Sequence, residues 1–133
     1  MLARNYRFTL LNLCGQTLAQ NSVTVQARRW KWGPAGARLD ESAEAQVYIM
    51  DAAAGLATGN YDSDAAVDNS ADKWVGGDFE LTVTAPTSAS GDVILYYEQS
   101  TDAGTTFASN GLGREVCRIN FAAAGTKVRH FAL

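Results

Sequence analysis

The stretch Gly91–Phe107, GDVILYYEQSTDAGTTF, decides the predicted fold, because a strand pattern runs directly into a turn pattern. Its first half, Val93–Glu98, is rich in the β-branched and aromatic residues typical of strands. In its second half, small polar residues alternate along the chain and an aromatic residue follows: Ser100, Asp102, Gly104, Thr106 and Phe107. Asp and Ser side chains hydrogen-bond nearby backbone amides, and glycine adopts positive φ without strain. We therefore expect Asp102 to accept hydrogen bonds from amides within its own turn.

This turn resembles the Asp-box, the pattern Ser-x-Asp-x-Gly-x-Thr-(Trp or Phe) of sialidase-type propellers and various other β proteins. Phe107 stands where the usual residue is Trp. In the proteins that carry it, the Asp-box is a folding device and not a catalytic site. The resemblance therefore implies a β-hairpin and gives no indication of chemistry.

Other strand patterns recur along the whole chain. The period-two alternation is cleanest in Phe79–Ala85, with Phe79, Leu81 and Val83 on the inner face. Strand patterns also occupy four further segments: Tyr6–Leu13, Ser22–Trp32, Glu115–Phe121 and Lys127–Leu133. Ala43–Met50 is ambiguous, since Asp40 or Ser42 can cap a helix there, whereas Val47, Tyr48 and Ile49 favour a strand. We favour the strand.

The chain is thus predicted to be all-β, an antiparallel β-sandwich or a small barrel of about seven strands. At 133 residues it is expected to form a single domain, 1–133. The segment Gly55–Asp78 is predicted to be one long acidic loop, because it holds five aspartates and few strand-forming residues. Loops of this length in compact domains are usually functional or ordered by a partner.

A calcium site is the only metal site that the spacing suggests, and the suggestion is weak. Asn60, Asp62 and Asp64 have the spacing that opens an EF-hand loop. However, Ala65 stands where that loop needs glycine and Ala71 where it needs glutamate. The EF-hand is therefore excluded, and the three residues are kept as weak Ca²⁺ ligands.

Catalysis is not indicated by any motif. His130 is the only histidine, and the chain has no nucleophile elbow, phosphate-binding loop or dinucleotide fingerprint. Cys14 and Cys117 are far apart and have no metal-binding spacing. The N-terminal segment lacks the apolar core of a signal peptide, so we expect synthesis in the cytoplasm and two free thiols. The expectation is a protein that is not an enzyme and needs no cofactor.

Composition narrows the range of partners. Charged residues make up 19% of the chain, below the roughly 25% of average proteins, and the net charge is −3. Low charge suits a surface packed against other subunits, although a surface of small neutral residues explains it equally well. We expect no nucleic acid, because the one basic cluster, Arg28, Arg29 and Lys31, reads as the wet side of an amphipathic strand. We expect no membrane insertion, because no apolar run approaches about 20 residues.

Four aromatic residues are candidates for an interface: Trp30, Trp32, Tyr61 and Trp74. They can pack into a subunit contact or stack on sugar rings. The segment from Phe79 to Leu133 is rich in Ala, Gly and Thr and contains the sequence STDAGTTF. In both features it resembles small structural proteins of tailed bacteriophage virions. That resemblance implies a non-enzymatic subunit of the capsid (a decoration or cement protein), neck, tail or baseplate, assembled in the host cytoplasm.

The partners implied are other virion subunits, either major capsid or tail proteins, and further copies of the same chain. Two classes of function stay open. One is the virion subunit. The other is a carbohydrate-binding module, or a receptor-binding tail module, that touches a glycan through Trp30, Trp32 and Trp74.

Overall fold

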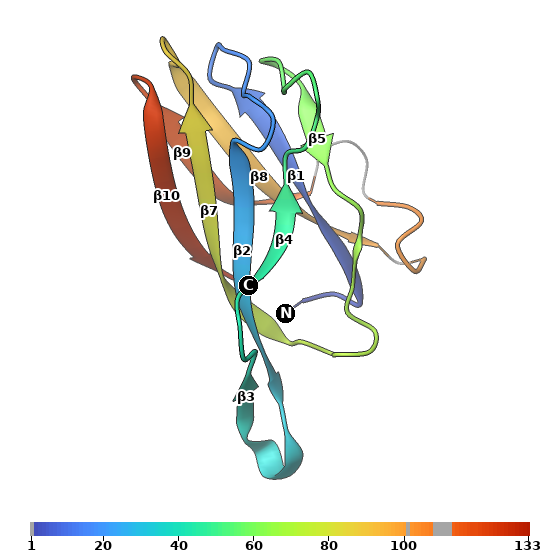
Figure 1. Cartoon of the computed structure of the whole chain (residues 1–133). Helices are drawn as coiled ribbons and strands as arrows, with labels where there is room; N and C mark the ends of the chain where they lie inside the picture. The colour runs from blue at the N-terminus through green and yellow to red at the C-terminus, as the bar shows by residue number, and fades with distance from the viewer. Residues whose placement is uncertain (1, 101, 108–112) are drawn as a thin grey trace.

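Two antiparallel sheets lie face to face in the computed structural model, which describes residues 2–100, 102–107 and 113–133 (Figure 1). The first sheet has the order β5-β1-β8-β9, with β6 also paired to β1: β1 (Asn5–Leu13), β5 (Tyr61–Ser63), β6 (Val67–Asp68), β8 (Gly91–Ser100) and β9 (Arg114–Phe121). The second has the order β10-β7-β2-β3, with β4 also paired to β2: β2 (Val23–Trp32), β3 (Arg38–Asp40), β4 (Ala45–Ile49), β7 (Gly76–Ala85) and β10 (Gly125–Ala132). The predicted all-β sandwich is confirmed, and the barrel alternative is wrong, because the described strands form two separate sheets.

The strand count of seven is wrong, because the described residues form ten strands. Every predicted strand segment is a strand, including the ambiguous Ala43–Met50, which holds β4. The three additional strands are β3, β5 and β6, none longer than three residues. Strands this short lie at sheet edges, where backbone pairing with a long neighbour replaces the hydrophobic alternation that sequence patterns detect.

The prediction of one long acidic loop is also only partly correct, since Gly55–Asp78 contains β5, β6 and the start of β7. Two of its aspartates tie this segment to the second sheet. The Tyr48 hydroxyl donates to Asp62 at 2.7 Å, and the Ile49 amide donates to Asp64 at 2.8 Å. The segment is thus ordered by contacts within its own chain.

The core fills the space between the sheets, and its alternation matches the predicted one. Phe79, Leu81 and Val83 of β7 are buried, while the residues between them lie toward solvent. Opposite them, Phe8 of β1 stands at the centre of an aromatic cluster. Its ring centroid lies 5.6–6.1 Å from four others: Tyr6, Phe79, Tyr97 and Phe131.

One hairpin extends beyond the body of the sandwich (Figure 1). We call Trp30–Asp40 the arm. β7 begins at Gly76, opposite Trp30, so β2 continues past Trp30 with only β3 beside it. The tip is a tight turn with a single 3-10 element, η1 (Pro34–Gly36), in which Ala35 and Gly36 have positive φ. The arm is therefore a two-stranded ribbon, which gains little stability from burial of its own.

Candidate interaction site

The arm carries the most exposed tryptophan of the chain. Trp32 is 60% exposed, and its ring meets Trp30 edge to face at 5.3 Å between centroids. Trp30 is covered more fully: the Arg38 guanidinium lies 5.1 Å from its centroid, and a Cβ at Gly76 would lie 2.8 Å from its Nε1. Glycine at that position leaves room for the Trp30 indole to approach the backbone of β7. Trp30 thus roots the arm, and Trp32 faces solvent.

An ion pair closes the base of the arm. The Arg29 guanidinium donates to both carboxylate oxygens of Glu41, at 3.0 and 2.5 Å, and the Arg29 amide donates to Glu41 at 3.0 Å. Both side chains are mostly covered, with exposed fractions of 13% and 15%. Burial raises the pKa of Glu41, but the hydrogen bonds and charge of Arg29 outweigh it and hold the pKa below its usual value. The pair is charged and fixed in a fork geometry.

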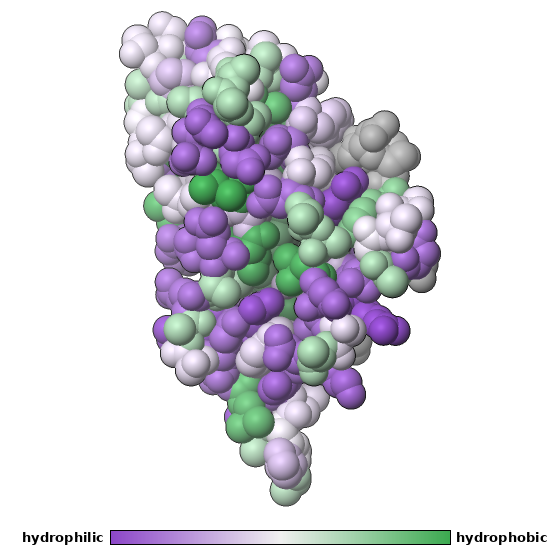
Figure 2. Space-filling view, turned by 45° about the vertical axis from the view of Figure 1, so that its right-hand side comes forward, coloured by the Kyte–Doolittle hydropathy of each residue, from purple (hydrophilic) through white to green (hydrophobic). Residues whose placement is uncertain are grey.

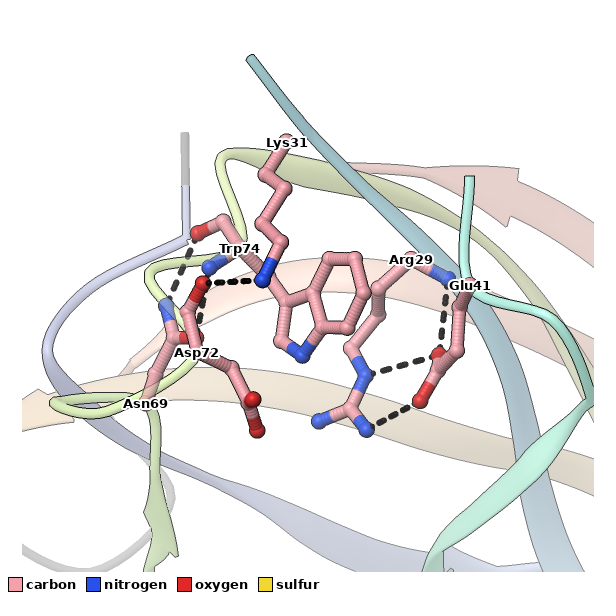
Figure 3. A network of polar contacts seen from close by, with 6 residues as sticks. All are labelled: Arg29, Lys31, Glu41, Asn69, Asp72 and Trp74. Carbon is pink, nitrogen blue, oxygen red and sulfur yellow. Dashed lines mark hydrogen bonds and ion pairs between the residues drawn. The ribbon is translucent and has the colours of Figure 1, made fainter. Parts of the chain in front are cut away.

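Trp74 packs against the Arg29 and Lys31 side chains of this junction and is half-buried (Figure 3). Its ring lies between two cations, with Lys31 Nζ 4.7 Å and Arg29 Cζ 5.5 Å from the centroid. The buried Asn69 fixes its backbone, accepting from the Trp74 amide and donating to the Trp74 carbonyl, both at 2.8 Å. Of the four predicted interface residues, the structure brings Trp30, Trp32 and Trp74 to one region. Tyr61, which is 45% exposed, lies on β5 of the other sheet.

The weak calcium ligands do not converge on a site. The carboxylates of Asp62 and Asp64 already accept hydrogen bonds from Tyr48 and Ile49, and the Asn60 carbonyl accepts from the Asn12 amide. In the described part of the chain, no group of three or more His, Cys, Asp or Glu residues is placed to hold a metal ion.

A groove of about 570 Å³ opens where the two sheets separate beside β4. We call it the β4 groove. Val47 and Ile49 of β4 form one apolar wall, and Ala65 and Val67 form the other. Asp51 and Asp64 lie among the lining residues as well. Burial, together with the charges of Asp51 and Asp62, raises the pKa of Asp64 against the opposing hydrogen bond from Ile49.

Comparisons with known proteins give no family for this chain. No family model matches it, and neither a curated protein nor a solved structure is similar to it. Nowhere in the described residues is there a helix of the length and apolar character that a membrane crossing requires.

The turn after β8 is held by hydrogen bonds among its own residues. Asp102 accepts from the Thr106 amide at 2.7 Å and from the Ser100 hydroxyl at 2.7 Å. The Gly104 amide of the same turn donates to Ser100 Oγ at 2.9 Å and not to Asp102. Gly104 has φ of 88°, and the Phe107 ring packs on the Arg7 guanidinium at 4.3 Å. All five predicted turn residues thus meet in one structural element, outside the interaction region.

We expect the Asp102 contribution to stability to vanish only in strong acid. Hydrogen bonds from the Thr106 side chain and amide, and from Ser100, lower the pKa of Asp102 to about 2. Because the folded pKa lies below the unfolded one of about 3.9, the stabilisation is present above about pH 4 and is lost as the pH falls through about 2. Asp102→Asn should remove this pH dependence from the melting temperature. A carboxyl titration by NMR with a midpoint near 3.9 would contradict the assignment.

The remaining reactive side chains are not gathered into a site. Cys14 is buried and Cys117 half-buried, both are free thiols, and burial raises the pKa of Cys117. His130 is exposed on β10, 3.7 Å from Glu80. Sequence reasoning missed Arg38, Glu41 and Asp51 as members of the interaction region. The run Gly33-Pro34-Ala35-Gly36 is a turn signal that could have revealed the arm, and with it Arg38 opposite Trp32.

Proposed function

We propose that this chain is a non-catalytic virion subunit of a tailed bacteriophage, which stabilises the particle through contacts with other subunits. Its place is the capsid surface, as a decoration or cement protein, or the neck, tail or baseplate. Its partners are the major capsid or tail proteins and further copies of itself, and it is assembled in the host cytoplasm. It uses neither cofactor, nucleic acid nor membrane.

One observation carries this proposal: the arm presents Trp32, 60% exposed, on a hairpin that stands outside the sandwich. Exposed tryptophan and arginine side chains are the residues that most often anchor protein interfaces. The arm is rooted firmly, because the Arg29–Glu41 pair and Trp30 fix its base. A fixed base means that docking the tip sacrifices little conformational freedom.

Glycan binding is the alternative function, and the geometry gives it less support. Stacking on a sugar requires an accessible ring face. A cation covers a face of Trp30, and two cations enclose Trp74, so Trp32 alone keeps a large exposed area. A single exposed ring is a weaker sugar platform than the three that the sequence suggested.

We expect Trp32→Ala to reduce incorporation of the chain into particles at least about tenfold, while the isolated domain keeps its melting temperature within experimental error. The measurement is quantitative mass spectrometry of density-purified particles from cells in which the native gene carries the change. Leu13→Ala, another exposed apolar residue, is the matched control. The number of copies per wild-type particle then distinguishes the capsid surface from the neck, tail or baseplate. The copy number of a cement protein is set by the symmetry of the capsid, and that of a tail protein by the symmetry of the tail. Absence of the chain from purified particles, combined with glycan binding in solution, would favour the alternative.

A further inference from the structure

The β4 groove is an open edge of the sandwich. Figure 2 shows hydrophobic residues gathered in the middle of this face, with hydrophilic residues around them. Among the described strands, β4 pairs with β2 alone, and a register shift leaves Val47 without a residue opposite it. Within the described residues, only the Ile49 amide of this edge is held by a side chain, that of Asp64. Apolar walls beside a strand edge that lacks a second partner strand are features of surfaces that receive another chain.

The two sides of the arm differ, and only one suits this groove. Residues directly opposite each other in a hairpin share a face, so Trp32 and Arg38 lie together. Leu39 lies on the other face, against its own hairpin, because a Cβ at Gly33 would lie 2.5 Å from its Cδ1. The docking face thus presents one large exposed ring and one guanidinium, with the Asp40 carboxylate that pairs with it on the same face.

The charges of the arm and groove are complementary. Arg38 rests on the Trp30 ring, and its side chain is still 50% exposed. Its ion-pair partner Asp40 is equally open at 54%, so the ion pair itself holds Arg38 weakly. The groove carries the carboxylates of Asp51 and Asp64. Arg29 lies at the groove too, but Glu41 already pairs with its charge. The guanidinium of an Arg38 that enters the groove would therefore meet the carboxylates of Asp51 and Asp64.

We propose that the arm of one copy docks into the β4 groove of a second copy, with Trp32 between the apolar walls and Arg38 facing Asp51 and Asp64. Within one molecule the arm points away from the body, so its tip reaches a neighbour (Figure 1). A groove of about 570 Å³ is of the size that accepts a large aromatic side chain. Because arm and groove are different surfaces, the contact is heterologous and repeats head to tail, closing into a ring or extending as a chain.

This inference rests on the proposed function, and a complementation experiment tests it separately. Trp32→Ala removes the aromatic side chain that docks, and Ala65→Arg places a large side chain in the groove at an exposed position. In sedimentation velocity runs, the wild-type protein should associate with increasing concentration, and each variant alone should associate at least about tenfold more weakly. Mixed in equal amounts, the two variants should form a dimer, because one keeps an intact groove and the other an intact arm.

The control variant is Ala123→Arg, which places the same side chain in the exposed turn between β9 and β10 and should associate like wild type. Association of Ala65→Arg at wild-type strength, or a mixture that stays monomeric, would overturn the docking. A wild-type chain that is monomeric at all concentrations would overturn it as well. If that monomer still enters particles through Trp32, the virion function holds and the arm binds a different subunit. If it never enters particles, the proposed function fails.

Discussion

Phe8→Ala should lower the free energy of unfolding by about 3–5 kcal/mol, the largest loss expected from any single change in this chain. Phe8 is 1% exposed and touches four aromatic rings from both sheets. Truncation removes apolar surface from the core and leaves a cavity that rigid rings on several strands cannot fill. Since small domains have a total stability of about 5–15 kcal/mol, much of the chain would be unfolded at moderate denaturant.

Phe131→Ala is the matched comparison for this prediction. Phe131 stacks on Phe79 at 5.2 Å in the same cluster, but it is only partly buried, on β10 at the sheet edge. We expect a smaller loss there, because water fills the space that the ring vacates. Urea unfolding of both variants measures the difference. Equal losses, or a loss below about 1 kcal/mol for Phe8→Ala, would mean that the cluster is not the centre of the core.

Arg29→Ala should lower the free energy of unfolding by about 2–4 kcal/mol and also loosen the arm. The change leaves the mostly covered Glu41 carboxylate with the Arg29 backbone amide and without its guanidinium. Removing one partner of a buried pair is costlier than removing both, because the remaining charge loses its compensation. Trp74 also loses one of its two cations.

A double-mutant cycle with Glu41→Gln measures the pair itself. We expect the double variant to be more stable than the sum of the two single losses predicts, by about 1–3 kcal/mol. Hydrogen exchange at Lys31, Leu39 and Asp40 should accelerate in Arg29→Ala, since the base of the arm opens first. Unchanged exchange together with a loss below about 0.5 kcal/mol would show that Trp30 alone roots the arm.

Much of the fold was predictable because long strands of a sandwich have strong local signals. Alternation in Phe79–Ala85 and the turn pattern at Ser100–Phe107 depend on neighbours in sequence, and both lead to the observed elements. β5 and β6 were not predictable, because their order comes from pairing with β1, which is distant in sequence, and from side-chain hydrogen bonds to β4. Local patterns do not contain such contacts.

The interaction region was predictable only in part. Alternation in Ser22–Trp32 places Trp30 and Trp32 on one face and Arg29 and Lys31 on the other, as observed. The expectation that the basic cluster forms the wet side is wrong, because Arg29 is only 13% exposed and the exposed Arg28 lies on the opposite face. The position of Trp74 could not be predicted from the sequence, because it depends on hydrogen bonds between Asn69 and the Trp74 backbone in the folded loop. The β4 groove was not predictable either, because its two walls come from separate segments that meet only in the folded chain.

The topology has a consequence for the speed of folding. β1 pairs along its whole length with β8, whose partner residues stand roughly ninety positions later in the chain, and β2 pairs with β7 across some fifty residues. Such distant pairings require closure of long loops before any contact compensates for the lost entropy, so we expect folding in milliseconds to seconds. On the ribosome, Tyr6, Phe8 and Leu10 emerge long before β8 exists to cover them. During synthesis the hydrophobic strand β1 therefore stays unpaired for a time, which exposes the nascent chain to aggregation. We expect chaperone binding during synthesis to protect this chain more than it protects a chain built of local hairpins.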